Sequence, residues 1–228
     1  MLVFEECDNI DRDELFDVLS LKNFQTILLY LFQALEAAHS RDIVHRDVKL
    51  GNILISQDFS NVILIDWGCG AYISDSMSSK AGSRSCRPPE MLLGYRNYGA
   101  KCDIWAMGIL IYQTLCGDIL PWKAKNSQKS LSILADYFGG QNLADIVHRY
   151  NLDEKNITFN LGPPKFDLES AFDEDFRDLF DNDLIDLMKK CLNLDLDQRP
   201  TAAQAMQHPF FRKAFSEYEY EDEDEAED

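Results

Sequence analysis

The sequence predicts an α-rich fold that carries one small β-hairpin, and three observations lead to this prediction. The 228 residues are 46% hydrophobic and 27% charged, a composition typical of a folded globular protein. Apolar residues recur at helical spacing in several long segments. β-branched and aliphatic runs are short, at 53–55 and 62–65, and the mostly polar stretch 56–61 separates them as in a hairpin.

The amino-terminal part of the predicted fold is helical up to this hairpin. Asp11 followed by Glu14 marks a plausible helix start. Apolar residues from 24 to 35 then repeat every ~3.6 residues, which predicts an amphipathic helix with a buried face. After the hairpin, residues 73–89 show little periodicity, so we expect a long loop there.

The remaining two thirds of the sequence is expected to be helical. The run 104–115 is apolar nearly all round, which predicts a central buried helix. A second apolar stripe covers 184–191, and the stretch 200–204 offers a capping box for a last helix. Residues 217–228 hold nine acidic residues and no basic one, so we expect residues 216–228 to be a disordered acidic tail.

The charge and the cysteines exclude several classes of protein. The 22 Lys and Arg against 40 Asp and Glu give a net charge of −18, which disfavours nucleic acid and anionic membranes as partners. The six cysteines form no Cys-x-x-Cys pair, which indicates a reducing compartment and no structural zinc. The longest uncharged run, 104–117, is shorter than the ~18 residues that span a bilayer. We expect a soluble, intracellular protein of the cytoplasm, the nucleus or both.

One segment carries the chemistry that the sequence indicates. The stretch 45–52 reads His-Arg-Asp-Val-Lys-Leu-Gly-Asn, and Asp66-Trp67-Gly68 follows directly behind the apolar run 62–65. Phosphoryl transfer needs carboxylate and carboxamide oxygens for magnesium, a base near the attacking hydroxyl and a cation on the moving phosphate. This segment supplies all three on one hairpin.

With these motifs the sequence resembles the eukaryotic protein kinases. Their signature is His-Arg-Asp, an Asn five residues past that Asp, an Asp-x-Gly motif and a later Pro-Glu, which is Pro89-Glu90 in this chain. Asp103 to Gly108 and Arg199 continue the pattern. Among kinases the chain is most similar to the casein kinase II catalytic subunits, which share the tryptophan at the position of Trp67. A cell-cycle kinase is the runner-up, and a preference for acidic over proline-directed substrates would distinguish the two.

The resemblance implies the residues that bind ATP and magnesium and that act on the substrate. By this resemblance, Asp47 is the base that orients the substrate hydroxyl, and Lys49 contacts the transferring phosphate. Asn52 and Asp66 are the residues that bind magnesium. Lys49, two residues after Asp47, is typical of serine/threonine kinases, and Ser83 matches the hydroxyl that contacts the catalytic loop. Leu54 and Ile65 would form the floor under the adenine, and the backbone of Glu5 to Cys7 would be the hinge that binds it.

Other motif residues have structural or substrate-binding interpretations. His45 and Arg46 are expected to support the loop, although Arg46 could pair with a phosphate. Asp103 is expected to tether the loop backbone, and Glu90 to pair with Arg199. Three cations in the loop, Lys80, Arg84 and Arg87, match positions that acidophilic kinases use on substrate carboxylates. The simpler alternative for these three is a solvated loop face.

The resemblance covers a carboxyl-terminal kinase lobe without the amino-terminal β lobe. No Gly-x-Gly-x-x-Gly occurs in the sequence, and residues 1–8 resemble the last strand of the missing lobe and the hinge. We expect 9–215 to be the carboxyl-terminal lobe. Two hypotheses follow: an incomplete form of an active serine/threonine kinase, which the intact catalytic residues favour, or a catalytically inert, pseudokinase-like interaction protein. Protein substrates with acidic Ser/Thr sites are the expected partners, and binding of the casein kinase II regulatory subunit is doubtful.

Overall fold

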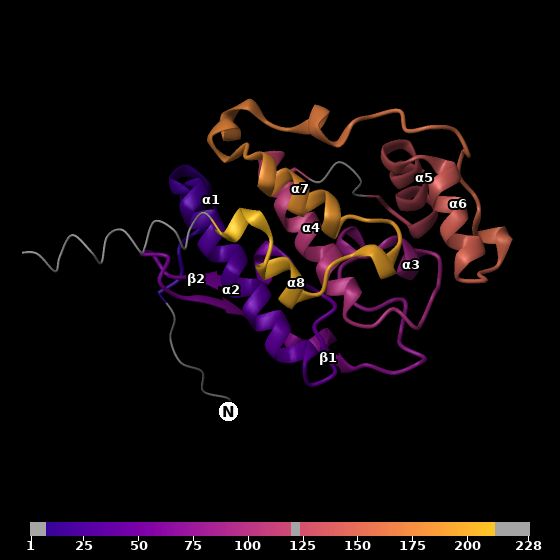
Figure 1. Ribbon diagram of the computed structural model, residues 1–228, viewed down its shortest axis with the longest axis horizontal. Helices are drawn as coiled ribbons and strands as arrows, with labels where there is room; N and C mark the ends of the chain where they lie inside the picture. Colours follow the sequence, from indigo (N-terminus) through magenta and orange to yellow (C-terminus); the bar gives the residue numbers. More distant parts are fainter. Residues whose placement is uncertain (1–7, 120–123, 213–228) are drawn as a thin grey trace, which may run out of the picture.

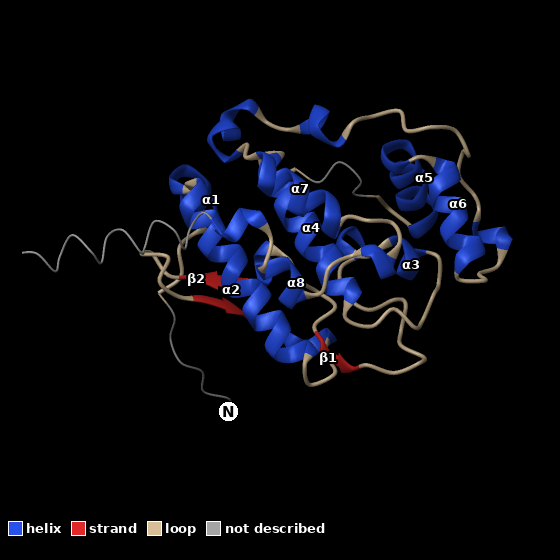
Figure 2. Ribbon diagram, viewed as in Figure 1, coloured by secondary structure: helices blue, strands red, loops and turns tan. Residues whose placement is uncertain are grey.

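The computed structural model describes residues 8–119 and 124–212. Within them, helices form most of the regular structure and the strands are short (Figures 1 and 2). The predicted α-rich fold with a small hairpin is confirmed. The helices are α1 (Arg12–Val18), α2 (Leu21–His39), α3 (Pro89–Leu92), α4 (Lys101–Leu115), α5 (Ser127–Phe138), α6 (Gly140–Arg149), α7 (Asn182–Cys191) and α8 (Ala202–Met206), and the strands are β1 (Ile43–Val44), β2 (Ile53–Ile55), β3 (Val62–Leu64) and β4 (Ala71–Tyr72).

Helix α4 is the centre of the hydrophobic core, as its uninterrupted apolar sequence predicts. All but two of its residues are buried, including Trp105 and Tyr112. It packs against α7, whose apolar stripe points inward, and α2 packs against α8. Figure 1 shows α5 and α6 at the opposite end of the molecule from α1 and the hairpin. Burial on this scale explains the fold, because each fully buried large apolar side chain contributes about 1.5–3 kcal/mol.

The amino-terminal helical region consists of two helices. Asp11 caps α1 by accepting a hydrogen bond from the Asp13 amide, which confirms the predicted start. The chain is extended at Leu19 and Ser20, and the Ser20 hydroxyl then accepts a hydrogen bond from the amide of Asn23 to begin α2. Because of this break, the direction in which α2 presents its buried face does not depend on the orientation of α1.

The segment between α6 and α7 corrects the prediction that the remaining sequence is helical. It holds only short 3₁₀ turns, Glu154–Asn156, Leu168–Ala171 and Glu174–Leu179, along an otherwise irregular path. An aspartate side chain caps each turn locally, which competes with helix propagation. Gly162-Pro163-Pro164 adds backbone that is incompatible with a continuous helix.

Two small antiparallel sheets bracket the segment that carries the chemistry. In the predicted hairpin, β2 pairs with β3 so that Leu54 lies opposite Ile63. Strand β1 pairs with β4, which brings Val44 opposite Ala71. Residues 45–52 therefore leave one sheet and enter the other, and 65–70 return in the reverse direction. The predicted loop, 73–89, is irregular apart from one 3₁₀ turn, Arg84–Cys86, and ends where α3 begins at Pro89.

Several predictions concern residues that the structure does not describe. The hinge strand with Glu5 and Cys7, and the acidic tail from residue 216, lie outside the described residues. Within the described ranges, the sheets are the two two-stranded ones, and no five-stranded β lobe is present. The same ranges contain no helix of the length and hydrophobicity that crossing a membrane requires.

Candidate active site

Asp47 lies at the centre of a buried hydrogen-bonded cluster. Its Oδ2 accepts hydrogen bonds from Lys49 Nζ at 2.7 Å and from Asn52 Nδ2 at 3.2 Å. Its Oδ1 accepts one from the backbone amide of Ser83 at 2.7 Å. Lys49 Nζ also donates to Ser83 Oγ at 3.0 Å. The cluster thus joins a carboxylate, an ammonium group and a hydroxyl from segments far apart in the sequence.

A tight turn folds Asn52 back onto Asp47. Residues Leu50–Asn52 form a 3₁₀ turn in which the Asn52 amide donates to the Lys49 carbonyl at 2.9 Å. The Asn52 side-chain amide also donates to the Asp47 carbonyl oxygen at 2.8 Å. Because Nδ2 is engaged twice, the amide oxygen Oδ1 is the end of this side chain left to bind a cation.

The pKa of Asp47 lies below its ordinary value and that of Lys49 lies above its ordinary value. Burial by itself raises the pKa of Asp47, but hydrogen bonds from Lys49 and Ser83 outweigh it and hold the pKa below its ordinary value. The same contact with Asp47 raises the pKa of Lys49 against the opposing effect of burial. At neutral pH the pair is therefore a carboxylate beside an ammonium ion.

Asp103, in the first turn of α4, holds the loop backbone from below. Its two carboxylate oxygens accept hydrogen bonds from the His45 amide at 2.8 Å and the Arg46 amide at 2.7 Å. His39 Nε2 lies 2.9 Å from the same carboxylate. Arg46 has a φ of 67°, which a residue other than glycine adopts only when its surroundings hold it there. The tether predicted for Asp103 is present.

His45 and Trp67 connect the two loops. His45 is fully buried, and its Nε2 lies 2.9 Å from the carbonyl oxygen of Ile65. Its ring meets that of Trp67 edge-on with centroids 4.6 Å apart. Trp67 Nε1 donates to the Leu64 carbonyl at 3.1 Å, a bond that phenylalanine cannot make. These contacts agree with a supporting role for His45.

Asn52 and Asp66 are the residues that could hold a metal. Asp66 is exposed, and its Oδ1 accepts a weak hydrogen bond from the Gly68 amide at 3.3 Å. The described residues contain no group of three or more His, Cys, Asp or Glu side chains that could hold a metal ion. An amide and a carboxylate oxygen nevertheless fit Mg²⁺, which usually takes one or two protein ligands together with substrate phosphates and water.

The predicted adenine floor is an apolar face of the hairpin. Leu54 and Ile65 are partly buried, and Ile63, which pairs with Leu54, is 38% exposed. Residues 53, 55, 62 and 64 point the other way and are buried in the core. This alternation leaves an aliphatic surface beside Asp66, and the adenine contact stays a prediction.

Glu90 and Arg199 form a fully buried ion pair. The two terminal guanidinium nitrogens, Nη1 and Nη2, donate to the Glu90 carboxylate at 2.7 Å. Arg199 also donates to the carbonyl oxygens of Asn193 at 2.7 Å and Lys101 at 3.1 Å, and its guanidinium lies 5.0 Å from the centroid of Trp105. The pair therefore joins α3 to the segment before α8, as predicted.

A family model for the protein kinase domain matches residues 1–211, which is nearly the whole chain. The chain belongs to the protein kinase family. In protein kinases the His-Arg-Asp motif marks the catalytic loop, and the span from the Asp-x-Gly motif to the Pro-Glu motif is the activation segment; we apply these names to residues 45–52 and 66–90.

The three predicted substrate-binding cations of this kinase differ in their surroundings. Lys80 and Arg84 are exposed, and Arg84 Nη1 donates to the carbonyl oxygen of Lys125 at 2.6 Å. Arg87 is partly buried and donates to the carbonyl oxygens of Ala81 at 2.8 Å, Gly82 at 2.8 Å and Lys80 at 2.5 Å. Arg87 thus shapes the activation segment, which leaves Lys80 and Arg84 as the more accessible charges.

Like Arg87, Arg46 forms hydrogen bonds with other groups of the chain. Its Nε donates to the Cys69 carbonyl at 2.5 Å, and Nη1 reaches the Tyr98 hydroxyl at 3.5 Å. Tyr98 in turn donates to the Ser78 carbonyl at 2.7 Å. Sequence reasoning missed Tyr98, because nothing in its local sequence indicates that it meets the activation segment.

Gly82 is a second residue that sequence reasoning missed. Its φ is +67°, and a Cβ atom there would lie 1.9 Å from the Arg46 carbonyl oxygen. Only glycine allows the activation segment to approach the catalytic loop this closely. Ser83 follows directly, so Gly82 sets the contact between Ser83 and Asp47. The only signal in the sequence was a glycine beside the predicted substrate loop.

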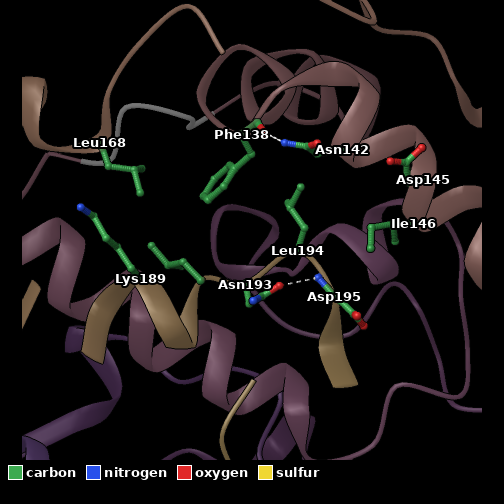
Figure 3. A pocket seen from close by; sticks show the side chains of 10 residues that line it. Phe138, Asn142, Asp145, Ile146, Leu168, Lys189, Asn193, Leu194 and Asp195 are labelled. Atoms are coloured by element: carbon green, nitrogen blue, oxygen red, sulfur yellow. Dashed lines mark hydrogen bonds between the residues drawn. The ribbon is translucent and has the colours of Figure 1, made fainter. Parts of the chain in front are cut away.

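A separate cavity of about 480 Å³ lies between α5, α6 and α7 (Figure 3). Phe138 and Leu194 point into it. Asn142 Nδ2 donates to the Phe138 carbonyl at 2.8 Å, and Lys189 pairs with Glu169 at 2.5 Å. None of the lining residues belongs to the catalytic loop. With these polar groups bonded within the chain, the cavity shows no chemical preference for a ligand.

Proposed function

We propose that this kinase transfers the γ-phosphate of ATP to serine or threonine hydroxyls in acidic protein segments, in the manner of the casein kinase II catalytic subunits. The arrangement of Asp47, Lys49 and Ser83 carries the proposal. A carboxylate accepts hydrogen bonds from an ammonium group and from the activation segment, while the same ammonium contacts a hydroxyl of that segment.

Each group has a defined task in the transfer. Asp47, a carboxylate at neutral pH, orients the substrate hydroxyl and takes its proton as the oxygen–phosphorus bond forms. The bond between the β- and γ-phosphates breaks, and ADP leaves with the electron pair. Lys49 places a positive charge where the transferred phosphoryl group accumulates negative charge. Asn52 and the Ser83 amide fix the Asp47 carboxylate for this role.

Asn52 and Asp66 are the residues that would hold magnesium. When bound there, magnesium would supply positive charge that neutralises the ATP phosphates. The free oxygen of Asn52 and the exposed carboxylate of Asp66 support this assignment, because Mg²⁺ prefers oxygen ligands.

The serine/threonine and acidic preferences rest on the activation segment. The Lys49–Ser83 contact is the one that the resemblance to serine/threonine kinases leads us to expect. The exposed cations Lys80 and Arg84 stand beside Ser83 in a chain with a net charge of −18. Charge complementarity favours substrate carboxylates at this point.

The proposal is tested with the 228-residue chain, Mg²⁺ and radiolabelled ATP. The substrate is a peptide whose single Ser is followed by Asp and Glu residues. We expect Asp47→Asn to lower the transfer rate by about 100-fold or more, since a positioned base contributes about 10²–10⁴. Asp17→Asn, which neutralises an exposed carboxylate on α1, is the matched control and should retain the rate.

Three outcomes would contradict the proposal. Transfer that survives Asp47→Asn would remove Asp47 from its role. Equal transfer to a peptide with Pro after the Ser and no acids would contradict the acidic preference and favour a proline-directed kinase. Peptide binding by the wild-type chain without any transfer would favour an inert interaction protein.

A further inference from the structure

Six exposed cations of the described residues form an ion pair with a carboxylate outside the active site of this kinase. Such pairs are expected in a chain with a large excess of acids. Such exposed pairs contribute little to stability, but they cancel the local positive field. The matched pairs are Arg12–Asp118, Arg149–Asp195, Lys165–Asp136, Arg177–Glu174, Lys189–Glu169 and Lys190–Asp186.

A group of cations near the substrate loop has no such partner among the described residues. Lys80, Arg84, Lys125 and Lys129 are all exposed, and no carboxylate of the described residues forms an ion pair with them. Lys80 and Arg84 belong to the activation segment, whereas Lys125 and Lys129 flank the start of α5. We call these four residues the basic strip.

A hydrogen bond joins the two halves of the basic strip. Arg84 Nη1 donates to the backbone carbonyl of Lys125 at 2.6 Å, across 41 positions of sequence. Lys125 directly precedes Asn126, whose side chain caps α5 by accepting from the Lys129 amide at 2.8 Å. The bond therefore fixes the beginning of α5 beside the activation segment, and α3 and α5 also pack together.

The basic strip begins at the catalytic carboxylate. Arg84 follows Ser83, whose amide donates to Asp47 Oδ1 at 2.7 Å. Arg84 is bonded to the carbonyl of Lys125, and the Asn126 cap of α5 accepts from the amide of Lys129. The unpaired charges therefore follow one another from the active site to α5. A substrate whose hydroxyl reaches Asp47 therefore has further positive charge within range of its neighbouring residues.

We propose that Lys125 and Lys129 form a second acidic-residue subsite, which binds Asp and Glu side chains farther along the substrate than those that meet Lys80 and Arg84. This inference rests on the proposed function and extends its substrate class to long acidic segments. A peptide fits better than a nucleic acid, because the strip is local and the rest of the surface repels a long polyanion.

The inference is tested by binding without ATP. Fluorescence anisotropy at low salt measures the affinity of a labelled peptide with one Ser and a long run of Asp and Glu. Lys125→Glu keeps the backbone carbonyl that anchors Arg84, so the loop geometry is preserved. We expect this variant to bind the long peptide about three- to fivefold more weakly, the upper part of the range for losing one exposed charge contact.

A short peptide and a charge-matched variant serve as controls. A peptide with acids only next to the Ser should bind Lys125→Glu and the wild type equally. Lys22→Glu changes the net charge by the same amount on α2, which begins at the end of the molecule opposite α5 (Figure 1). It should leave both affinities within about twofold, because a distant exposed charge is screened.

The outcomes separate this inference from the proposed function. Equal weakening by Lys22→Glu, or unchanged binding in Lys125→Glu, would overturn the subsite while leaving phosphate transfer to Ser unaffected. Tighter binding of a single-stranded oligonucleotide than of the acidic peptide would also overturn it. Recovery of Lys125→Glu binding by a peptide with Lys at the distal positions would support it. A loss of phosphate transfer with unchanged peptide affinity would contradict the role of Asp47 and not the subsite.

Discussion

At the scale of single residues, Trp67 combines an aromatic ring with an N–H group that donates a hydrogen bond. Its indole N–H bonds to the Leu64 carbonyl and its ring packs against His45, so the Asp66 loop is fastened to strand β3. The bond is partly exposed, since Trp67 is 39% accessible. A modest contribution to stability is therefore expected.

Trp67→Phe tests this bond. The variant should lower the free energy of unfolding by about 0.5–1.5 kcal/mol, the usual net value of one hydrogen bond. Urea denaturation followed by circular dichroism measures the change. Tyr72→Phe is the control, because Tyr72 is 74% exposed and should change stability by less than about 0.5 kcal/mol. An unchanged midpoint for Trp67→Phe would show that the bond contributes nothing.

The buried pair of Glu90 and Arg199 gives a second prediction at this scale. Arg199→Met leaves the Glu90 carboxylate buried without its partner and should cost about 3–5 kcal/mol. Adding Glu90→Leu should recover part of this loss, because no uncompensated charge remains. Chemical denaturation of both single variants and the double variant measures the coupling. Losses that simply add in the double variant would contradict the pairing.

At the scale of elements, Gly108 allows α4 and α7 to pack closely. A Cβ atom at this position would lie 2.8 Å from Leu192 Cγ and 2.9 Å from Cys191 Cβ, both at the end of α7. Glycine is otherwise unfavourable within a helix, by about 0.5–1 kcal/mol relative to alanine. Its presence in the middle of α4 therefore reflects packing.

Gly108→Ala measures the balance of these two effects. Overpacking should outweigh the gain in helix propensity and destabilise the fold by about 1–3 kcal/mol. Gly51→Ala provides the comparison, because its Cβ would meet only Lys49 Cε at 3.9 Å. Thermal unfolding of the two variants should differ by several degrees. Equal or higher stability of Gly108→Ala would show that α7 can move away without cost.

Elements with strong local signals were predictable, and those that depend on distant contacts were not. The apolar run of α4, the hairpin and the capping box of α8, where Thr201 and Gln204 bond reciprocally, each express a local rule. The motifs also grouped Asp47, Lys49 and Asn52 correctly in space. The 3₁₀ turns before α7 arise from local aspartate caps that compete with helix periodicity. The Arg84–Lys125 contact spans two segments and has no sequence signature.

At the scale of the whole molecule, burial divides the described cysteines into two groups. Burial raises the pKa of Cys86 to about 11 and that of Cys191 to about 12, and it raises the pKa of Cys102 well above the ordinary value. Cys116 is buried as well, and burial raises its pKa to about 11. Cys69, beside the Asp66 motif, is partly exposed.

Thiol labelling tests the packing of the described residues as a whole. In a Cys7→Ser background, iodoacetamide at pH 8 should modify Cys69 within minutes and leave the four buried thiols unmodified, because only the thiolate reacts. Unfolding in urea should expose all five, and mass spectrometry counts the adducts. Cys69→Ser should remove the rapid reaction. Rapid labelling of Cys102 or Cys191 in the native protein would contradict the packing around α4.

The tether from Asp103 also sets an order of events during folding. The amides of His45 and Arg46 donate their hydrogen bonds to a side chain more than 50 positions later in the chain, and Arg46 holds a backbone conformation that it would not keep alone. A growing polypeptide therefore makes the catalytic loop before it makes the residue that shapes it. The loop can reach its working form only once α4 has been synthesised and has docked.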